Sequence, residues 1–247
     1  MNLDRIIAVR NDKTVYRNGE LAIKIFNGCY SCTDVLSEAL NQARAAETGL
    51  SVPGVAEVTV LDGKWSIISE YVKGRTLARL MEENPADTGV YLEIFTKLQL
   101  KMHEKSVPAM SRLYDKLKRR INMADLDGTL RCELLERIDS MPRYDKLCHG
   151  DFCPENIVIR RDGEPFILDW PHASAGDPAA DAAVTYLLFC LEGASDTAEK
   201  YLELLYAGNP AGRQYIQKWI PIAAASLSVR KRSDQRRLLL SWAAESL

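Results

Sequence analysis

The chain has 247 residues, of which 47% are hydrophobic and 27% are charged, and its formal net charge is −2 at pH 7. This length and composition are typical of a soluble globular protein with one large core or two smaller ones. A charge this close to zero argues against nucleic acid as the main partner. The opening residues lack the apolar segment of a signal peptide, and no apolar run approaches the ~20 residues of a membrane span. We therefore expect a cytoplasmic protein without a membrane or nucleic-acid partner.

Six cysteines are scattered through the sequence rather than arranged in a regular framework. Cys29 and Cys32 have the spacing of a redox pair or of half a zinc site. Because the sequence has no second pair at zinc spacing and only three histidines, we expect free thiols with a structural role. Whether Cys29 and Cys32 have a further role stays open.

The first seventy residues have the pattern of a small β-rich region. The predicted strands are short runs rich in β-branched or aromatic residues, at 5–9, 14–16, 21–26, 55–60 and 65–69. Asn18-Gly19 and Asp62-Gly63 join two pairs of these strands as hairpin turns. Lys24 lies on the third strand, where it alternates with Ile23 and Ile25.

One helix interrupts this region. It is predicted over 34–48, with Thr33 or Asp34 as its cap and Gly49 at its end. Glu38 lies in its first turn, where the helix dipole favours a negative charge.

From residue 75 onward the pattern is mainly helical. The predicted helices include an apolar face through 91–102, two amphipathic helices within 111–139 that break at 126–128, a buried helix over 182–191, and helices at 198–206, 213–228 and 234–246. The cationic run at 116–120 is expected to be a solvated helix face rather than a nucleic-acid patch.

The most informative stretch is a predicted hairpin at 157–168. A β-branched run, the Asp162-Gly163 turn and a second apolar run predict two antiparallel strands. Antiparallel pairing would bring Asn156, before the first strand, close to Asp169, after the second. Pro154 is expected to keep the preceding turn out of helix, so that Asp151 and Asn156 are presented from an extended loop.

Asp151, Asn156 and Asp169 together have the chemistry of a phosphoryl-transfer site. Mg²⁺ prefers hard oxygen ligands together with phosphate oxygens of the substrate, and Asn156 and Asp169 supply a carboxamide and a carboxylate. Asp151 is then available for the substrate hydroxyl. Taken one at a time, each of the three could equally be an ordinary turn residue, because Asp and Asn favour turns.

The motifs around these residues resemble a known family. His149-Gly-Asp-Phe-Cys-Pro-Glu-Asn156, Ile167-Leu-Asp-Trp170 and Gly176-Asp-Pro-Ala-Ala-Asp181 are similar to those of the aminoglycoside phosphotransferase and choline kinase family, small-molecule relatives of the protein kinases. The protein-kinase catalytic loop has Arg where this chain has Gly150, and Phe-Gly where it has Trp170-Pro171. Both departures resemble the small-molecule branch.

The resemblance implies an α+β, two-lobed, protein-kinase-like fold. Residues 1–72 would form a small antiparallel β lobe that binds the nucleotide. Residues 73–247 would form a larger, mainly helical lobe with the catalytic loop and the acceptor pocket.

The resemblance also implies roles for individual residues. Asp151 would be the catalytic base, and Asn156 and Asp169 the metal ligands. Lys24 resembles the kinase lysine that holds the α- and β-phosphates, and Glu38, in preference to Glu47 near the helix end, resembles its helix partner.

Further residues of the site follow from the same resemblance. The segment 70–74 is similar to the linker between kinase lobes, in which the backbone of Glu70 and Val72 would hold the adenine edge. His149 and Asp181 would support the site structurally, Asp181 by bracing the catalytic loop, and His103 would also be structural.

One element of the protein kinases is missing. They cover the phosphates with a Gly-x-Gly-x-x-Gly loop, whereas 9–16 contains no glycine. The absence favours the small-molecule branch, and Asn11 and Thr14 become candidates for holding the β-phosphate.

The sequence therefore predicts an enzyme that uses Mg²⁺ and ATP or GTP to phosphorylate a hydroxyl of a small molecule. The alternatives are a protein serine/threonine kinase and an inactive kinase-like module that binds nucleotide. Aminoglycosides, amino alcohols, sugars and other hydroxylated metabolites stay open as acceptors. Carboxylates on the last helices lean towards a cationic acceptor, and the sequence does not indicate the oligomeric state.

Overall fold

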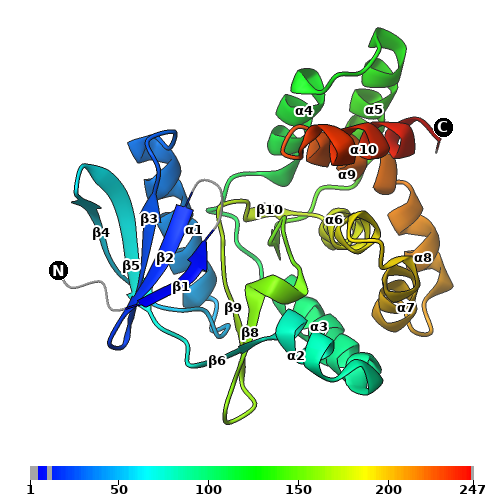
Figure 1. The fold of residues 1–247 in the computed structure, drawn as a ribbon. Coiled ribbons are helices and arrows are strands. Elements are labelled where there is room, and N and C mark those ends of the chain that lie inside the picture. Colours follow the sequence, from blue (N-terminus) through cyan, green and yellow to red (C-terminus); the bar gives the residue numbers. More distant parts are fainter. Residues whose placement is uncertain (1–4, 10–12, 246–247) are drawn as a thin grey trace. The chain divides into compact units, whose positions relative to one another are not determined.

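The computed structural model describes residues 5–9 and 13–245 (Figure 1). Packing divides the chain into two compact units, Met1–Pro85 with Pro154–His172 and Ala86–Cys153 with Ala173–Leu247. Each unit is thus built from two separate stretches of sequence. The functional boundary expected between residues 72 and 73 stays a prediction.

The first unit contains a five-stranded antiparallel sheet with the order β1-β2-β3-β5-β4. Its strands are β1 (Arg5–Val9), β2 (Lys13–Asn18), β3 (Leu21–Phe26), β4 (Val55–Leu61) and β5 (Lys64–Glu70). Each overlaps a run predicted from the sequence. The Asn18-Gly19 turn joins β2 to β3, and Gly19 adopts the left-handed φ of 59° that such a tight turn requires.

Helix α1 (Cys32–Glu47) packs on this sheet through Val35 and Ala39, which contact Phe26 and Ile67 (Figure 1). The predicted cap at Thr33 or Asp34 was wrong, because Ser31 caps the helix. The Ser31 hydroxyl accepts a hydrogen bond from the Asp34 amide, and the Asp34 carboxylate accepts one from the Ser31 amide. This reciprocal pair satisfies two unpaired N–H groups and so starts the helix earlier than expected.

A three-stranded antiparallel sheet completes the first unit, with α2 (Leu77–Glu83) beside it. Its order is β6 (Gly74–Thr76), β8 (Ile157–Arg160) and β9 (Pro165–Ile167). The hairpin predicted around Asp162-Gly163 is present, with Ile157 opposite Ile167. The extended loop expected before it was only partly right, because residues 151–153 are not helical but Pro154–Asn156 forms a 3-10 turn, η2. Proline is compatible with the first position of such a turn, where its missing N–H would have no partner.

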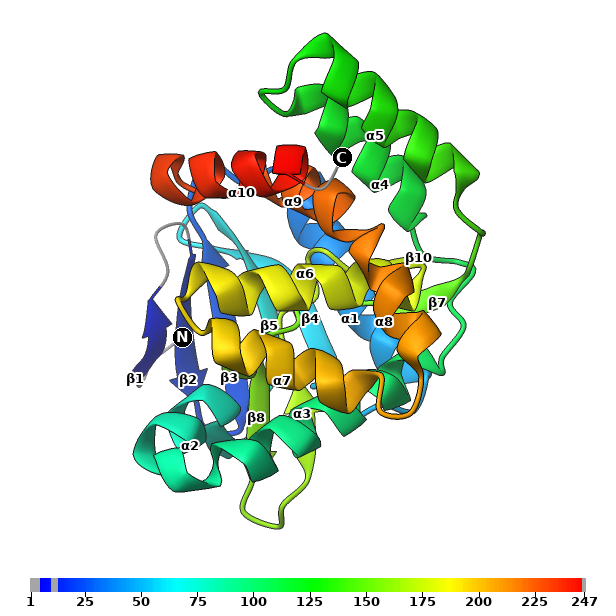
Figure 2. The ribbon, with the colours of Figure 1, turned by 90° about the vertical axis from the view of Figure 1, so that its right-hand side faces the viewer.

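The second unit is mainly helical (Figure 2). Its helices are α3 (Thr88–His103), α4 (Leu113–Met123), α5 (Gly128–Ser140), α6 (Pro178–Leu191), α7 (Ser195–Leu205), α8 (Pro210–Gln217), α9 (Ile220–Ser228) and α10 (Ser233–Glu245), and a short 3-10 turn, η1 (Pro85–Asp87), precedes α3. Strands β7 (Lys146–Cys148) and β10 (Ser174–Gly176) pair antiparallel. No helix in the part of the chain that the structure describes has the length and apolar character of a membrane span.

Aromatic side chains form the centre of the second unit. The ring centroid of Phe95 lies 4.6 Å from that of Phe152, 5.5 Å from that of Phe189 and 5.8 Å from that of Tyr201. Helix α9 packs against α4, α6 and α10. The single helix predicted over 213–228 was wrong, because Pro221, which lacks a backbone N–H, lies at the start of a separate helix, α9.

A buried polar network links α3 to α6. Asp181 Oδ1 accepts a hydrogen bond from the Gly150 amide at 2.7 Å, and Asp181 Oδ2 lies 2.9 Å from His103 Nε2. Gln99 Nε2 lies 3.4 Å from Asp181 Oδ2 and also donates to Thr185 Oγ1 at 3.1 Å. Burial would raise the pKa of Asp181, but the contacts with His103 and Gly150 hold it below its usual range.

Replacing Gly74 by alanine should destabilise the first unit. A Cβ at this position would lie 2.2 Å from the carbonyl oxygen of Ile159 on the paired strand β8, so the backbone would have to move. We expect a loss of about 1–3 kcal/mol in the free energy of unfolding, measured by urea denaturation. Gly28→Ala is the matched control, since a Cβ there meets nothing within 4 Å. Equal stability of the two variants would contradict the tight β6–β8 approach.

Asp181→Asn should destabilise the protein in a pH-dependent way. The depressed pKa means that the charged carboxylate stabilises the fold above the ordinary value of 3.8 and loses this contribution as the pH falls through the folded pKa. We expect the variant to be less stable by about 2–3 kcal/mol at pH 7, with a gap that narrows below about pH 4. Urea unfolding at several pH values measures this gap. A gap that stays constant down to pH 3 would show that the charge of Asp181 does not matter.

Candidate active site

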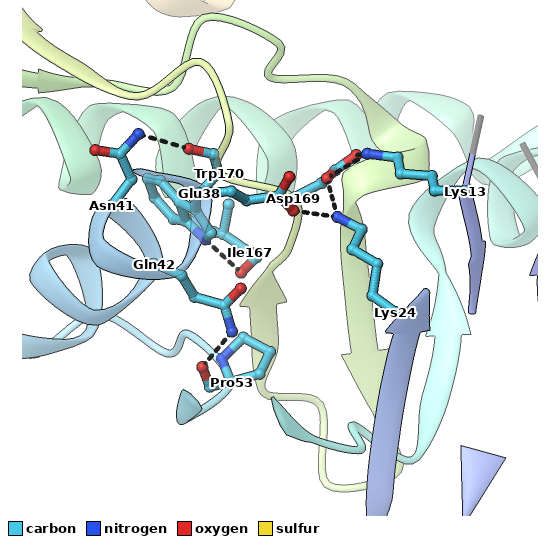
Figure 3. Close-up of polar contacts among 9 residues, drawn as sticks. All are labelled: Lys13, Lys24, Glu38, Asn41, Gln42, Pro53, Ile167, Asp169 and Trp170. Carbon is cyan, nitrogen blue, oxygen red and sulfur yellow. Dashed lines mark hydrogen bonds and ion pairs between the residues drawn. The ribbon is translucent and has the colours of Figure 1, made fainter. Parts of the chain in front are cut away.

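Lys24 lies between two carboxylates in the first unit (Figure 3). Its ammonium group donates to Glu38 Oε1 of α1 and to Asp169 Oδ1, the latter at 2.5 Å. Burial would lower the pKa of Lys24, but Asp169 and Glu38 together raise it above its ordinary value. The lysine is therefore a fixed positive charge at neutral pH. Glu47, the rival partner considered from the sequence, is exposed at the end of α1.

A second lysine, which sequence reasoning missed, contacts the same carboxylate. Lys13 Nζ donates to both oxygens of Asp169, at 3.0 and 3.1 Å (Figure 3). Burial would raise the pKa of Asp169, but Lys24 and Lys13 hold it well below its usual range. The alternation of side chains along β2 could have predicted that Lys13 lies on the same face of the sheet as Lys24. Val15 pairs with Lys24, and Lys13 lies two residues from Val15 on the same face.

Asp169 has an unusual backbone as well as two cationic partners. Its φ of 65° lies in the left-handed region, which non-glycine residues seldom adopt and which is enriched at functional sites. Contacts on the following residue hold this conformation: Asn41 of α1 donates to the Trp170 carbonyl oxygen at 3.2 Å, and Trp170 Nε1 donates to the Ile167 carbonyl oxygen at 3.1 Å (Figure 3). The carboxylate is thus aimed by the fold.

Asn156 and Asp169 lie at corresponding ends of the β8–β9 hairpin. The Leu168 amide donates to the Asn156 carbonyl oxygen at 2.8 Å, which continues the pairing up to the residue before Asp169. Both residues line the same cavity, and the Asn156 side chain is buried. A carboxamide and an ionised carboxylate are hard oxygen donors, so this pair suits Mg²⁺.

The cavity that holds these groups has a volume of about 700 Å³ and lies within the first unit. Its apolar walls come from both sheets: Val15, Ala22, Ile67, Val72, Val158 and Leu168. Charged residues also line it, and Lys13, Lys24 and Asp169 are the three that contact one another. Apolar walls with polar groups that converge on one point are typical of a small-molecule site.

Glu70 and Val72, predicted to hold a base through their backbone, also line this cavity. Thr14 is not among the lining residues, because it points to the opposite face of β2 from Lys13 and Val15. Asn11, the other candidate for holding a phosphate, lies outside the described residues.

The catalytic loop predicted from the sequence belongs to the second unit. Gly150 has a φ of 75°, a conformation that would strain the arginine found there in protein kinases. Its amide donates to Asp181, and its carbonyl oxygen accepts a hydrogen bond from Arg230 Nη2 at 2.9 Å. His149 is fully buried, with its ring centroid 5.9 Å from that of Phe152. Asp151, the next residue after Gly150, is half-buried.

Asp151 and the two metal-ligand candidates thus belong to different units. Asp151 is part of the second unit, whereas Asn156 and Asp169 are part of the first. The chain alone limits the separation of the Asp151 and Asn156 Cα atoms to about 18 Å, the reach of five extended residues.

None of the six cysteines, all of which lie within the described residues, forms a disulfide, and this includes Cys29 and Cys32. Within residues 5–9 and 13–245, no three His, Cys, Asp or Glu side chains gather into a metal-binding cluster. A zinc-type site at Cys29 and Cys32 therefore finds no further ligand of these kinds among the described residues.

Comparison with solved structures establishes the fold. A thermostable mutant of the aminoglycoside phosphotransferase APH(4)-Ia, in a ternary complex with AMP-PNP and hygromycin B, matches with a TM-score of 0.69 and 17% identity over 98% of this chain and 90% of that one. The choline kinase LicA from Streptococcus pneumoniae matches with a TM-score of 0.68 and 14% identity over 100% and 92%. A choline/ethanolamine kinase family protein from Mesorhizobium loti matches with a TM-score of 0.63 and 17% identity over 100% and 87%.

These likenesses confirm the α+β, protein-kinase-like fold, with an antiparallel sheet in the N-terminal region and a mainly helical remainder. A search of curated protein sequences found no match. The model of the phosphotransferase enzyme family matches residues 10–215, which is most of the chain. The resemblance seen in the sequence motifs is thereby confirmed, and the chain belongs to the phosphotransferase enzyme family.

Proposed function

We propose that this protein is a kinase that transfers the γ-phosphoryl group of ATP or GTP to a hydroxyl of a small molecule. The observation that carries the proposal is the cavity of the first unit, in which Lys24, paired with Glu38, and Lys13 meet Asp169. Cations for phosphate oxygens and a carboxylate for a metal are the groups that phosphoryl transfer requires. Solved neighbours were crystallised with ADP or AMP-PNP together with hygromycin B, which agrees with this reading.

The nucleotide would bind with its base between the apolar walls of this cavity and its edge against the backbone of Glu70 and Val72. Its phosphates would lie against Lys24 and Lys13. Because 9–16 contains no glycine, Lys13 at the start of β2 takes over part of the charge neutralisation that a glycine-rich loop provides elsewhere. Asn156 and Asp169 would hold Mg²⁺, which neutralises charge on the phosphate oxygens when bound.

Asp151 would orient the acceptor hydroxyl and accept its proton late in the transfer. The acceptor oxygen forms a bond to the γ-phosphorus while the bond to the nucleoside diphosphate oxygen breaks. Asp181 and Arg230 act on Asp151 through the neighbouring backbone, because they hold the Gly150 amide and carbonyl oxygen. Through these backbone contacts both are positioning residues for the Asp151 carboxylate.

Asp169→Ala should remove the dependence of nucleotide binding on Mg²⁺. The variant loses a metal ligand, but it also releases Lys13 and Lys24 to the phosphates, so the affinity for metal-free nucleotide should not fall. We therefore expect Mg²⁺ to tighten ATP or GTP binding at least tenfold in the wild type and less than twofold in the variant, by calorimetric titration. Asp162→Ala, in the exposed β8–β9 turn, is the control. An unchanged Mg²⁺ effect in Asp169→Ala would refute the metal site.

Asp151→Ala should reduce turnover by about 10²–10⁴-fold while nucleotide binding persists, because a general base is lost without a nucleotide contact. Phosphorylation is measured by mass shift with Mg²⁺ and ATP or GTP against a panel of hydroxylated amines, antibiotics, sugars and peptides. Asp196→Ala, at an exposed position of α7, is the control. Nearly full activity in Asp151→Ala would mean that the base is wrongly assigned, and turnover of peptides alone would indicate a protein kinase. Nucleotide binding with no turnover of any panel member would favour the inactive module.

A further inference from the structure

A group of four cations lies in the second unit near the catalytic loop, and is named here the α4–α9 cationic cluster. It consists of Lys116, Arg119 and Arg120 on α4 and Arg230 just after α9. Helices α4 and α9 pack against each other (Figure 2). The ring centroids of Tyr114 and Trp219 at this junction are 6.1 Å apart.

The solvated face predicted for 116–120 was therefore only partly right. Arg119 is exposed, and Lys118 reaches outward to form an ion pair with Asp139. Lys116 and Arg120, in contrast, are half-buried. The helical period puts them on one face of α4, four residues apart.

The four cations repel one another. Burial and then Arg120, Arg119 and Arg230 lower the pKa of Lys116 to about 8. Burial and then Arg230 and Arg119 lower the pKa of Arg120. The carboxylate that acts on both Arg120 and Arg230 is Asp151. Arg120 and Arg230 thus place positive charge near the proposed catalytic base.

The ion pairs of the described residues do not include this cluster. None of the four cations takes part in an ion pair within 4 Å there. Lys116 Nζ donates to the Ala173 carbonyl oxygen at 2.5 Å, and Arg230 Nη2 donates to Gly150. Both contacts are to neutral groups. Arg230 Nε is shielded from solvent and has no hydrogen-bond partner in the described part of the chain. Such a donor is costly unless a ligand engages it.

We propose that the α4–α9 cationic cluster binds a carboxylate or phosphate group of the phosphoryl acceptor, so that the substrate is a hydroxylated anion. The proposal rests on the proposed function, because it takes Asp151 as the group that orients the acceptor hydroxyl. Guanidinium groups bind carboxylate and phosphate oxygens through paired hydrogen bonds. Arg120 and Arg230 are the two specificity-determining residues.

A cationic acceptor, towards which the sequence leaned, is disfavoured. Two of the carboxylates on the last helices that suggested it are already engaged: Glu199 pairs with Arg213 and Glu203 pairs with Lys200. An ammonium group near Asp151 would meet the like charges of Arg120 and Arg230, and like-charge contacts are an effective way to reject a ligand.

The phosphates of the nucleotide share the chemistry of the proposed anion, so the test has to separate the two. The full-length protein is titrated with inorganic phosphate as the probe, once without nucleotide and once saturated with Mg²⁺ and ADP. Calorimetry and thermal unfolding are the readouts. A ligand that binds only the folded state raises the melting temperature. The variants are Arg120→Gln and Arg230→Gln, and Arg237→Gln, exposed on α10, is the charge-matched control.

We expect saturable phosphate binding in the wild type and in Arg237→Gln, weakened at least tenfold in Arg120→Gln and in Arg230→Gln. Arg120→Gln is the decisive variant. Arg230 also donates a hydrogen bond to the Gly150 carbonyl oxygen, so its replacement also removes a contact of the catalytic loop. Phosphate binding that disappears once ADP saturates the protein would assign the cluster to the nucleotide and overturn the proposal. Equal phosphate affinity in all variants, or no saturable binding in the wild type, would also overturn it.

A second measurement uses turnover, with glycerate, glucose 6-phosphate and glycerol 3-phosphate compared with glucose, choline and hygromycin B. The anions should be phosphorylated preferentially, and Arg120→Gln should raise the KM for them at least tenfold with little effect on the KM for the nucleotide. Preference for choline or hygromycin B would refute the anionic acceptor while leaving the kinase function intact. Failure of the kinase function itself would show separately, as the loss of Mg²⁺-dependent nucleotide binding.

Discussion

The first unit depends on one buried charge arrangement, in which Lys24 joins Glu38 of α1 to Asp169 after β9. Each of these groups would be costly to bury alone, because taking a charge out of water is compensated only by a partner at close range. Lys24 therefore ties α1 to the end of the β8–β9 hairpin, two elements more than a hundred residues apart in sequence. Loss of any member leaves a charge uncompensated in the cavity.

The same arrangement explains how an unfavourable backbone is maintained. Asp169 keeps a left-handed φ because Lys24 and Lys13 hold its carboxylate and Asn41 holds the next carbonyl group. Such strain persists only where surrounding contacts overdetermine the geometry. In the second unit, Gly150 reaches a similar φ without strain because it has no side chain, and Asp181 and Arg230 fix it from both sides. Surrounding contacts thus hold a left-handed backbone at Asp169, whereas the choice of glycine permits one at Gly150.

Sequence rules that act over a few residues correctly predicted the elements that depend only on neighbouring residues. The Asn18-Gly19 and Asp162-Gly163 turns fixed two hairpins, because turn chemistry and alternation act over a few residues. Ser31 was missed as the cap, although its capping box with Asp34 was readable from the spacing. The contact of Lys13 with Asp169 and the half-buried state of Arg120 depend on how distant segments pack, which one sequence alone does not specify.

Charge balance distinguishes the two units chemically. In the first, Lys13 and Lys24 face Glu38 and Asp169, so the charges of these four groups balance and the lysines can exchange a carboxylate for a phosphate. In the second, Arg120 and Arg230 of the α4–α9 cationic cluster act on Asp151, and the four cations of the cluster form no ion pair within the described residues. A site with balanced charges does not destabilise the ligand-free protein. A site with excess positive charge lowers the stability of the fold, and a bound anion offsets this loss. An excess of positive charge kept beside the proposed base is thus a cost that the binding of a hydroxylated anion would offset.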